Sequence, residues 1–505
     1  MKYYAGIDIG TTGTKTVLFD KNGNAVASAY REYPLYQPQN GYVEQDPADW
    51  WNAVCNTLTE VTSHIFAKDI AGVGISGQMH GLVMLDDNGN VLRKSIIWCD
   101  QRTQNECEEI EHTVGKNKLI SITASPALTG FTASKILWVK NNEPQLFSKC
   151  AHILLPKDYI RYMLCNTFAT DVSDAGGMQL FDIKNRRFSE ELCHLLGIDT
   201  AMLGKVYESH EITGFITEKA AKLTGLMPGT PVVGGAGDNA AAAIGTGTVC
   251  DGECFATIGT SGVVFCHTKG YNVDPSGRAH SFCAAVKNEW HMMGVTQAAG
   301  LSLKWFRDNC CGDVDNLAKE RGLSAYQYLD SIAKESGIGA NKLLFLPYLM
   351  GERTPHLDPN ARGVFFGLST IHKKGDMVRA ILEGVGFSLR DALEVLKENG
   401  VSINRITVCG GGAKSSLWCS ILADIFGMDV CTLSITEGPA LGAAILAMVG
   451  TGEYKDVQTA AKNIIRPRQV YRHSPQNAEK YDQLYQLYKS LYQKLKTAFT
   501  VLSDI

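Results

Sequence analysis

The sequence has no long hydrophobic run, no excess of positive charge and no low-complexity segment. None of its apolar stretches approaches the roughly 20 residues that span a bilayer, and its first residues lack the basic and apolar regions of a signal peptide. A formal net charge of −4 over 505 residues offers little to the phosphates of a nucleic acid. We therefore expect a cytoplasmic protein that has neither a membrane nor a nucleic acid as its partner.

The cysteines show neither a framework spacing nor a pattern of metal ligands. There are 15 of them, an odd number, and several lie in apolar runs, at Cys254, Cys266, Cys409 and Cys431. A cysteine in such a run behaves as a small hydrophobic residue. We therefore predict buried free thiols in a reducing compartment, rather than disulfides or a zinc site.

Length and pattern indicate two domains of α/β structure. The chain is long enough for two units of roughly 250 residues, and strands are mixed with helices throughout. We predict that the domains cover residues 1–244 and 245–505. The expected strands lie within 3–36, 70–75, 254–256, 263–266 and 406–409. The expected helices lie within 46–65, 132–142 and 413–422, begin near 156, 238 and 439, and include an aromatic stripe over 481–495 that predicts core packing.

One short motif occurs twice. Residues 8–15 read Asp-Ile-Gly-Thr-Thr-Gly-Thr-Lys, and residues 257–262, about half the chain further on, read Thr-Ile-Gly-Thr-Ser-Gly. Each copy lies between two apolar runs, which predicts a strand, a tight turn and a second strand. Glycines let backbone amides converge in such a turn, and hydroxyls add donors, so the turn suits a phosphate group. The repetition indicates two similar domains that face one nucleotide.

The two copies differ at the residue that enters the turn. Asp8 in the first copy suits Mg²⁺, because hard cations prefer carboxylate oxygens; the alternative is an aspartate that caps the turn. Thr257 stands at the corresponding position of the second copy. Lys15 either offsets phosphate charge or is an ordinary lysine after a turn.

Asp238 is the strongest candidate for a catalytic group. It follows the glycine-rich residues 234–237 and opens an alanine-rich helix. A carboxylate that is buried there is costly unless it accepts hydrogen bonds or a proton, and this suits a general base that takes a proton from a substrate hydroxyl. The alternative is a helix cap. Met79 and His80 follow a glycine turn at a strand end, where α/β proteins contact ligands, although a lone histidine is often structural.

Two further polar segments follow apolar runs, at residues 98–102 and 351–356. In the second of these, Glu352 and Arg353 either belong to a site or form a structural ion pair. Residues 411–415 resemble the end of a P-loop, but Ala413 replaces a required glycine. The sequence has no convincing dinucleotide fingerprint, no paired-histidine zinc helix and no Gly-x-Ser-x-Gly motif.

Together, these motifs resemble the FGGY family of carbohydrate kinases, from the first residues to about residue 450. The family's signature regions correspond to residues 130–142 and 363–383, while 77–81, 155–159 and 351–356 resemble its members that phosphorylate xylulose. The resemblance implies two actin-like (ribonuclease-H-like) domains with the active site in the cleft between them. It also implies ATP and Mg²⁺ as cofactors and D-xylulose or a similar ketose as the small-molecule substrate. Ribulose, gluconate and glycerol stay open as acceptors, as do a non-metabolic actin-like ATPase and a homodimer.

The resemblance also assigns roles to residues. Asp238 would accept the proton, and Asp8 would lie at the magnesium. The implied sugar contacts are Met79, His80, Asp238 and Asn239. The nucleotide contacts, with Lys15 added from its position after the first turn, are Thr12, Lys15, Thr260, Trp305, Gly411 and Gly412. One departure is Ala236, where relatives often have glycine; alanine is tolerated if its φ is negative.

Overall fold

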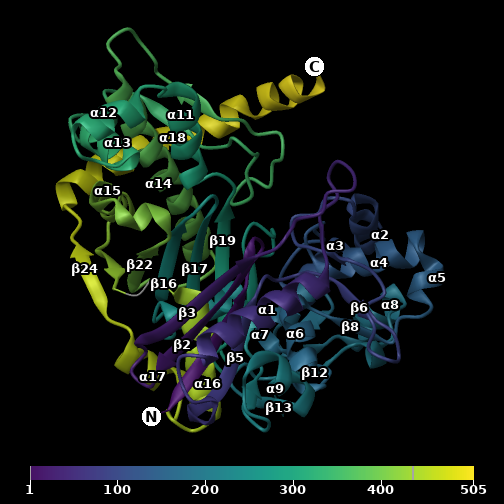
Figure 1. Ribbon diagram of the computed structural model, residues 1–505. Coiled ribbons are helices and arrows are strands. Elements are labelled where there is room, and N and C mark those ends of the chain that lie inside the picture. Colours follow the sequence, from purple (N-terminus) through teal and green to yellow (C-terminus); the bar gives the residue numbers. More distant parts are fainter. Residues whose placement is uncertain (1, 435–436) are drawn as a thin grey trace.

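The computed structural model describes residues 2–434 and 437–505 of the chain. Two seven-stranded sheets form its framework, and helices pack on both of them (Figure 1). The first sheet has the strand order β13-β14-β5-β1-β2-β3, with β15 paired to β5, and the second has the order β18-β19-β17-β16-β22-β23-β24. The predicted α/β architecture is confirmed.

The first sheet is built from the first half of the chain. Its strands are β1 (Tyr3–Ile9), β2 (Gly13–Asp20), β3 (Ala25–Glu32), β5 (Ile70–Gly77), β13 (Ile212–Phe215), β14 (Pro231–Val233) and β15 (Ala236–Gly237). β1 and β2 form an antiparallel hairpin, β3 continues it, and β5 runs parallel to β1 on the other side. The three antiparallel strands predicted within residues 3–36 are therefore confirmed.

The second sheet repeats this arrangement. Its strands are β16 (Glu253–Ile258), β17 (Gly262–Thr268), β18 (His280–Cys283), β19 (Trp290–Thr296), β22 (Arg405–Cys409), β23 (Val430–Leu433) and β24 (Pro467–Tyr471). β16 and β17 form an antiparallel hairpin, and β22 runs parallel to β16 on the other side. Both copies of the repeated motif thus join two hairpin strands, as predicted, and each hairpin lies beside a parallel strand.

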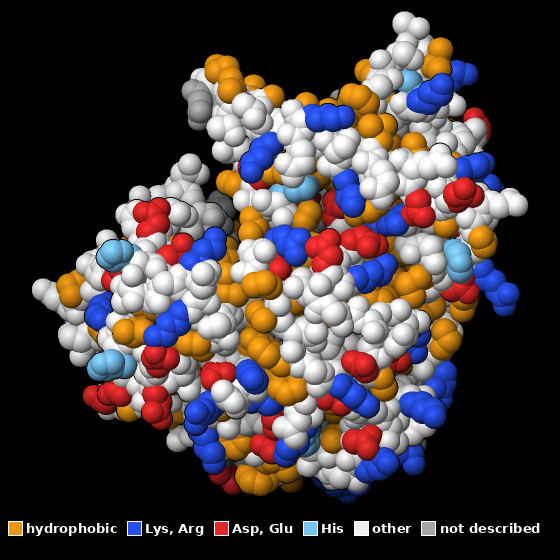
Figure 2. Space-filling model, turned by 180° about the vertical axis from the view of Figure 1, so that it is seen from behind, with side chains coloured by type: hydrophobic (Ala, Val, Ile, Leu, Met, Phe, Trp, Pro, Cys, Tyr) orange, Lys and Arg blue, Asp and Glu red, His pale blue; other side chains and the backbone are white. Residues whose placement is uncertain are grey.

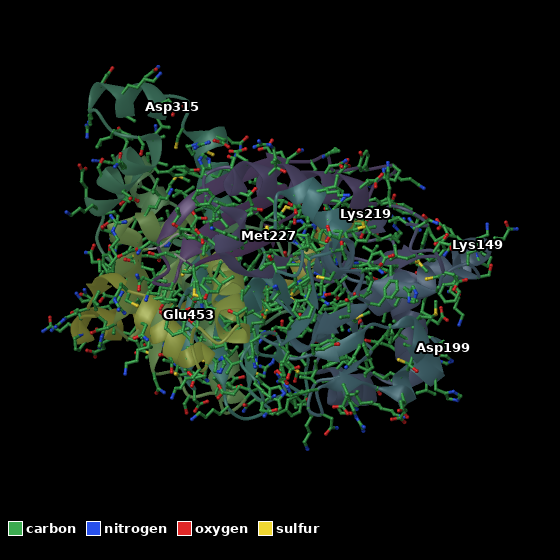
Figure 3. The ribbon with its side chains drawn as sticks, turned by 60° about the horizontal axis from the view of Figure 1, so that its bottom comes forward. Lys149, Asp199, Lys219, Met227, Asp315 and Glu453 are labelled. Carbon is green, nitrogen blue, oxygen red and sulfur yellow. A yellow bond between two sulfur atoms is a disulfide. The ribbon has the colours of Figure 1, made fainter. Side chains whose placement is uncertain are left out.

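The remaining elements of the first half pack on the first sheet or form a group to one side of it (Figure 1). Asp46 caps α1 (Pro47–Thr62) by accepting a hydrogen bond from the amide of Ala48 at 3.0 Å. The other elements are β4 (Glu44–Gln45), η1 (Ala67–Asp69), β6 (Val83–Leu85), β7 (Ser95–Ile96), α2 (Gln104–Val114), α3 (Lys116–Thr123), α4 (Thr132–Asn142), α5 (Pro144–Phe147), β8 (His152–Leu154), α6 (Pro156–Cys165), β9 (Ala169–Asp171), α7 (Val172–Ala175), η2 (Gly176–Met178), β10 (Phe181–Asp182), β11 (Arg187–Phe188), α8 (Glu190–Leu196), η3 (Thr200–Met202), β12 (Lys205–Tyr207) and α9 (Glu218–Thr224). Figure 3 shows Lys149 and Asp199 of this region at one end of the molecule, with Asp315 and Glu453 towards the other.

Helices of the second half form layers on the second sheet, some in direct contact with its strands and others packed on further helices. They and the small elements between them are α11 (Gly300–Cys310), α12 (Val314–Glu320), α13 (Ala325–Lys334), β20 (Leu344–Leu346), β21 (Val364–Phe366), α14 (Lys374–Glu398), η4 (Gly411–Lys414), α15 (Ser416–Phe426), α17 (Val457–Ile464) and α18 (Pro475–Asp504). Tyr481 and Tyr485 of α18 are buried, and their hydroxyls donate hydrogen bonds to Glu383 at 2.8 Å and to Asp391 at 2.7 Å, both on α14. The aromatic stripe is core packing, as predicted.

Two helices rich in small residues, α10 (Asp238–Gly245) and α16 (Gly438–Gly450), pack tightly against each other. A Cβ atom at Gly442 of α16 would lie 1.9 Å from the carbonyl oxygen of Ala241 in α10. α16 also packs on β1 and β5, where a Cβ at Gly6 would lie 1.9 Å from the carbonyl oxygen of Ala440. A segment from the end of the chain thus covers the first sheet, and the division at residue 244 stays a prediction.

The structure corrects the prediction for two cysteines. Cys254 in β16 and Cys266 in β17 are direct partners in the hairpin and form a disulfide. The expectation of free thiols is therefore wrong for this pair, because the hairpin register places the two side chains face to face. The other 13 cysteines are free, as predicted, although Cys250 and Cys310 are exposed rather than buried.

The surface mixes charges of both signs. On the face shown in Figure 2, acidic and basic side chains are interspersed among uncharged ones. No helix formed by the described residues is long and apolar enough to cross a bilayer.

Candidate active site

Asp8 and Asp238 come together at one end of the first sheet. Asp8 in β1 lies opposite Ser76 in β5, and on its other side Ser76 lies opposite Ala236 in β15. The chain passes from β15 directly into α10, which begins at Asp238. Because β1, β5 and β15 are parallel, the two carboxylates lie at the carboxyl ends of their strands, where α/β sheets bind ligands.

The carboxylate of Asp238 is half-buried and has one oxygen available. Oδ1 accepts hydrogen bonds from the backbone amide of Asn239 at 2.7 Å and from its Nδ2 at 3.0 Å. Oδ2 has no hydrogen bond or ion pair within residues 2–434 and 437–505. Burial raises the pKa of Asp238 to about 6, although the two bonds from Asn239 act in the opposite direction. Gly237, not Asp238, is the N-cap of α10, so the carboxylate is not a simple helix cap.

Asp8 has a buried oxygen, Oδ1, without a hydrogen-bond partner among the residues that the structure describes. Burial, together with the charge of Asp238, raises the pKa of Asp8 to about 7. A divalent cation would compensate such a pair of carboxylates. The described part of the chain has no cluster of three or more His, Cys, Asp or Glu side chains suited to a metal. The unpartnered oxygen of Asp8 fits Mg²⁺, which is usually held by one or two carboxylates and the substrate phosphates.

Lys15 pairs with a carboxylate of the protein itself. It follows the first turn in β2 and forms an ion pair with Glu437, the residue before α16. The pair joins the first turn to a helix that packs on both α10 and the first sheet. A contact between Lys15 and a nucleotide stays a prediction.

The first turn offers unused backbone donors. The amide of Gly10 closes the turn by donating to the carbonyl of Gly13 at 3.0 Å. Nε2 of Gln45 holds it from outside by donating to the carbonyl of Thr11 at 2.7 Å. In the described part of the chain, the amides of Thr11 and Thr12 donate to no other group, and Thr12 is exposed. Free amides on a tight turn are what an anion-binding concavity requires.

The second turn is closed in a similar way but is one residue shorter. The amide of Gly259 donates to the carbonyl of Ser261 at 3.0 Å, and the carbonyl of Thr260 accepts a hydrogen bond from Leu301 of α11 at 3.2 Å. Gly259 and Thr260 are exposed. The turn is therefore fixed by the start of α11 while its outer face stays open.

A cavity of about 640 Å³ opens beside the second turn. Its lining includes Thr260, Lys304, Tyr326, Asp330, Gly411 and Gly412. Gly410 has φ +82°, and a Cβ atom there would lie 2.7 Å from the carbonyl oxygen of Ile258. Only glycine therefore lets the segment before Gly411 approach the second turn this closely. The structure thus brings together three of the predicted nucleotide contacts, Thr260, Gly411 and Gly412. Trp305 lies on α11 with 36 % of its surface exposed and does not line this cavity, although its neighbour Lys304 does.

His80 sits between the two halves of the molecule. It adopts φ 68°, and its Nδ1 makes a hydrogen bond with the carbonyl of Gly177 at 2.8 Å. Its ring lies 4.2 Å from that of Phe131 and 6.4 Å from that of Phe282, which belongs to β18 of the second sheet. Burial, with the charge of Lys135, lowers the pKa of His80 to about 3. The imidazole is therefore neutral near pH 7 and can hydrogen-bond a hydroxyl.

Met79 packs against the turn that carries Asp238. A Cβ atom at Gly237 would lie 2.8 Å from Cγ of Met79. Asn239 follows in α10 and orients the Asp238 carboxylate through the two hydrogen bonds already described. Three of the predicted sugar contacts, Met79, Asp238 and Asn239, thus lie close together, with His80 next to Met79 in the chain.

Comparison with known families identifies the protein family to which this chain belongs. Residues 3–245 match the N-terminal domain, and residues 254–451 the C-terminal domain, of the FGGY family of carbohydrate kinases. The chain belongs to this family. An FGGY kinase is a phosphotransferase that moves a phosphoryl group from ATP to an alcohol of a carbohydrate.

The similarity covers the whole chain. The xylulose kinase of Bacillus subtilis is 40% identical over 506 residues, which span 100% of this chain and 99% of the relative. The gluconokinase of the same organism is 33% identical over 507 residues, 99% of this chain and 98% of the relative. A crystal structure of a ligand-bound xylulose kinase from Lactobacillus acidophilus has a TM-score of 0.92 at 30% identity, covering 99% of this chain and 100% of that one. This agreement confirms the two-domain FGGY kinase fold predicted from the sequence.

Two details that the sequence left open in this FGGY kinase are resolved. Ala236 does not have positive φ; the strained position is Gly235, with φ +69°. Alanine is therefore compatible with the turn before Asp238, as predicted. Glu352 accepts hydrogen bonds from the hydroxyls of Thr296 at 2.6 Å and Ser388 at 3.1 Å. It forms no side-chain ion pair with Arg353 in the part of the kinase that the structure describes, so that alternative is not observed.

Lys135 is a residue of the site that sequence analysis did not single out. It is fully buried in α4, and its Nζ donates hydrogen bonds to the carbonyl of His80 at 2.8 Å and of Gly130 at 2.7 Å. Burial lowers its pKa to about 7. The sequence did contain a signal for Lys135, which is a lysine among the mostly apolar residues of 132–139. A buried lysine needs hydrogen-bond acceptors, so such a position indicates a specific polar contact.

The kinase also has a larger cavity, of about 890 Å³, near the carboxyl end of α10. Thr246, Cys250, Arg405 and Lys462 are among the residues that line it. It contains none of the predicted site residues, whereas Asp238 lies at the opposite end of the same helix. Cavity size alone therefore does not mark the active site.

Proposed function

We propose that this FGGY kinase phosphorylates D-xylulose at its terminal hydroxyl and forms D-xylulose 5-phosphate. The observation that carries the proposal is the available Oδ2 of Asp238, at the sheet end that also holds Asp8, with Met79 against the preceding Gly237 and Asn239 bonded to the other oxygen. The choice of sugar is supported by the 40% identity to the B. subtilis xylulose kinase over the full length of both chains.

Asp238 acts as the general base in this reaction. The hydroxyl oxygen of the sugar forms a bond to the γ-phosphorus of ATP, while the bond between that phosphorus and the bridging oxygen breaks and ADP leaves with the electron pair. Oδ2 of Asp238 accepts the hydroxyl proton. A carboxylate with a pKa of about 6 is mostly ionised near pH 7 and is still more basic than an ordinary aspartate.

The other residues of the site bind and orient the reactants. The free amides of the turns at Thr12 and Thr260 receive the phosphates, and Gly411 and Gly412 border the cavity for the nucleoside. Asp8 would hold Mg²⁺, which would offset charge on the transferring phosphoryl group.

His80 binds the sugar, and the surrounding rings limit access by water. The neutral imidazole hydrogen-bonds a sugar hydroxyl, while Phe131 and Phe282 form an apolar wall beside it. Excluding water protects ATP from hydrolysis while the sugar is in place.

The acceptor is tested by initial rates of ADP formation with D-xylulose, D-ribulose, gluconate, glycerol and no sugar. We expect kcat/KM for D-xylulose to exceed that of every other acceptor by at least about 10-fold, because misplaced hydroxyls leave polar groups of the site unpaired. A higher kcat/KM for gluconate, the substrate named for the 33% identical relative, would replace D-xylulose. Sugar-independent turnover with nucleotide-driven assembly would instead indicate an actin-like ATPase.

A further inference from the structure

A buried cluster of charged residues lies beneath the turn that leads to Asp238, and the proposed reaction does not use it. Two cations, Lys157 and Arg161 of α6, lie among three carboxylates, Asp158, Asp171 and Asp174. All five side chains are at most 1 % exposed. Buried charge is costly, so a cluster of this size is expected to do something that an apolar core would not.

Lys157 is the centre of the cluster. Its Nζ lies 2.6 Å from Asp158, 2.8 Å from Asp171 and 3.5 Å from Asp174. Burial raises the pKa of Asp174 well above the usual range of an aspartate. Lys157 therefore holds the three carboxylates together at the centre of the cluster.

The cluster holds the turn before Asp238 at both of its ends. At the first end, Arg161 donates a hydrogen bond to the carbonyl of Gly234 at 3.0 Å. At the second end, the hydroxyl of Ser173 accepts a hydrogen bond from the amide of Gly237 at 3.2 Å. Ser173 in turn donates its own proton to Oδ2 of Asp171 at 2.6 Å, and Asp171 is paired with Lys157.

The turn itself cannot fix its own position. Residues 234–237 read Gly-Gly-Ala-Gly and carry no polar side chain. Its backbone is held by the pairing of β15 with β5, by the cluster and by two further bonds, from the amide of Gly234 to the carbonyl of Glu211 and from the amide of Gly235 to that of Ser209, both at 2.9 Å. Among the side chains that bond this turn, Ser173 lies nearest to Asp238, because Gly237 is the residue directly before it.

We propose that Ser173, oriented by Asp171 and Lys157, is a positioning residue that fixes the Gly237–Asp238 backbone and so aims the Asp238 carboxylate at the sugar hydroxyl. This inference rests on the proposed role of Asp238 as the base. Ser173 touches neither reactant; it acts through the Gly237 amide. A displacement of about 1 Å in a catalytic group can lower a rate by about 100-fold.

The chain supplies a matched control for Ser173. The hydroxyl of Ser209 donates to the same Oδ2 of Asp171, at 2.7 Å, and its side chain is equally buried. It makes no side-chain bond to the turn among the described residues. Ser173→Ala and Ser209→Ala therefore remove the same kind of bond from the same acceptor, but only the first removes the bond to Gly237.

The experiment compares both variants with the wild-type enzyme in steady-state kinetics and in amide hydrogen exchange. We expect Ser173→Ala to lower kcat at least about 10-fold with the KM for the sugar within about twofold. We expect the Gly237 amide to exchange at least about 10-fold faster in this variant, because its acceptor is gone. Ser209→Ala should change neither quantity, although both variants should lose similar thermal stability.

Each outcome decides the question. A kcat for Ser173→Ala that equals that of Ser209→Ala overturns the proposal, whether or not the Gly237 amide exchanges faster. A Ser173→Ala variant that fails to fold while Ser209→Ala folds also overturns it, because Ser173 is then structural. Failure of the function itself appears separately, as the absence of sugar-dependent turnover in the wild-type enzyme.

Discussion

At the scale of single residues, two carboxylates at the same sheet end are prepared for different tasks. Asp238 keeps one oxygen bonded to Asn239 and the other available, which suits a group that must accept a proton. Asp8 has a buried oxygen without a partner in the described part of the chain, which suits a group that must hold a cation. Their shared environment raises both pKa values, to about 6 and about 7. The difference in hydrogen bonding, not in residue type, separates the roles.

The raised pKa of Asp238 predicts the pH dependence of the reaction. Below about pH 6 the carboxylate is protonated and cannot accept the hydroxyl proton, so kcat/KM for the sugar should fall as the pH decreases through this value. Above it the base is ionised and the acid limb should level off. The measurement is kcat/KM against pH at saturating ATP and Mg²⁺. A profile that stays flat down to about pH 4.5, close to the range of an ordinary aspartate, would contradict the assignment.

Asp8→Asn should separate function from stability. The variant should need a higher Mg²⁺ concentration for half-maximal rate and should lose most of its activity, because the cation loses its carboxylate. The folded-state pKa of Asp8 is raised above its unfolded value, so the stability that Asp8 contributes is present at low pH and lost as the pH rises through about 7. Asparagine does not titrate, so the variant does not lose this stability as the pH rises. Denaturant unfolding should therefore show the variant gaining stability relative to wild type between about pH 4 and pH 7; a constant difference would argue against a buried, charged Asp8.

Single residues were predictable where their local context was unusual. Asp238 stands out because glycines precede it and alanines follow it. Ser173 has no such context, since its partner Gly237 lies 64 residues away and is brought near only by the sheet. Lys15 could not be assigned to Glu437 for the same reason. Contacts across the chain require the register of the strands, which a single sequence does not contain.

At the scale of elements, glycine turns place the functional groups. The turn before Asp238 approaches β5 so closely that a Cβ atom at Gly235 would lie 2.0 Å from the carbonyl oxygen of Ile75. Gly235 also has φ +69°, a conformation that costs other residues about 1–3 kcal/mol. A side chain at residue 235 would therefore cause both a steric clash and backbone strain.

Gly235→Ala should therefore be much more disruptive than a matched glycine substitution. Gly229 also has positive φ, +82°, but a Cβ atom added there would meet nothing within 4 Å among the described residues. We expect Gly229→Ala to lose about 1–3 kcal/mol from its backbone conformation alone. Gly235→Ala should lose more stability and also lower kcat, because relief of the clash moves Asp238. Equal melting temperatures for the two variants would show that the close approach is unimportant.

Elements with strong local signals were predictable, and a pairing within one of them was overlooked. The hairpin of residues 3–20 and the helices within 46–65 and 132–142 were expected from turn and periodicity signals. The Cys254–Cys266 disulfide was not. Its signal was present, because the two cysteines are placed symmetrically about the turn at Thr260. Antiparallel strands bring such positions opposite each other.

At the scale of the whole molecule, the sheet of the first half is completed by a helix of the second. α16 packs on β1, β5 and α10, with glycines and alanines at each contact. Tyr4 of β1 donates a hydrogen bond from its hydroxyl to Glu453, just after α16, at 3.0 Å (Glu453 is labelled in Figure 3). Sequence patterns place the two motifs in separate halves, but they do not show this return of the chain.

Because α16 of the second half packs on the first sheet, we predict that residues 1–244 do not form an independent folding unit. Without α16, one face of β1 and β5 is exposed, and the fragment should unfold without a cooperative transition in urea. Mixing it with residues 245–505 should restore the transition. A cooperative transition in the isolated fragment would instead support a domain boundary at residue 244.

The role of Asp238 as the base is tested most sharply by the kcat of Asp238→Asn with D-xylulose and Mg²⁺-ATP. Asparagine keeps the shape of the side chain but cannot accept the proton. Asp86→Asn, in a surface turn away from the site, serves as the control. We predict a kcat at least about 100-fold below that of the wild-type enzyme for Asp238→Asn, with its fold intact, and a near-normal kcat for Asp86→Asn. A folded Asp238→Asn enzyme with a near-normal kcat would contradict this role.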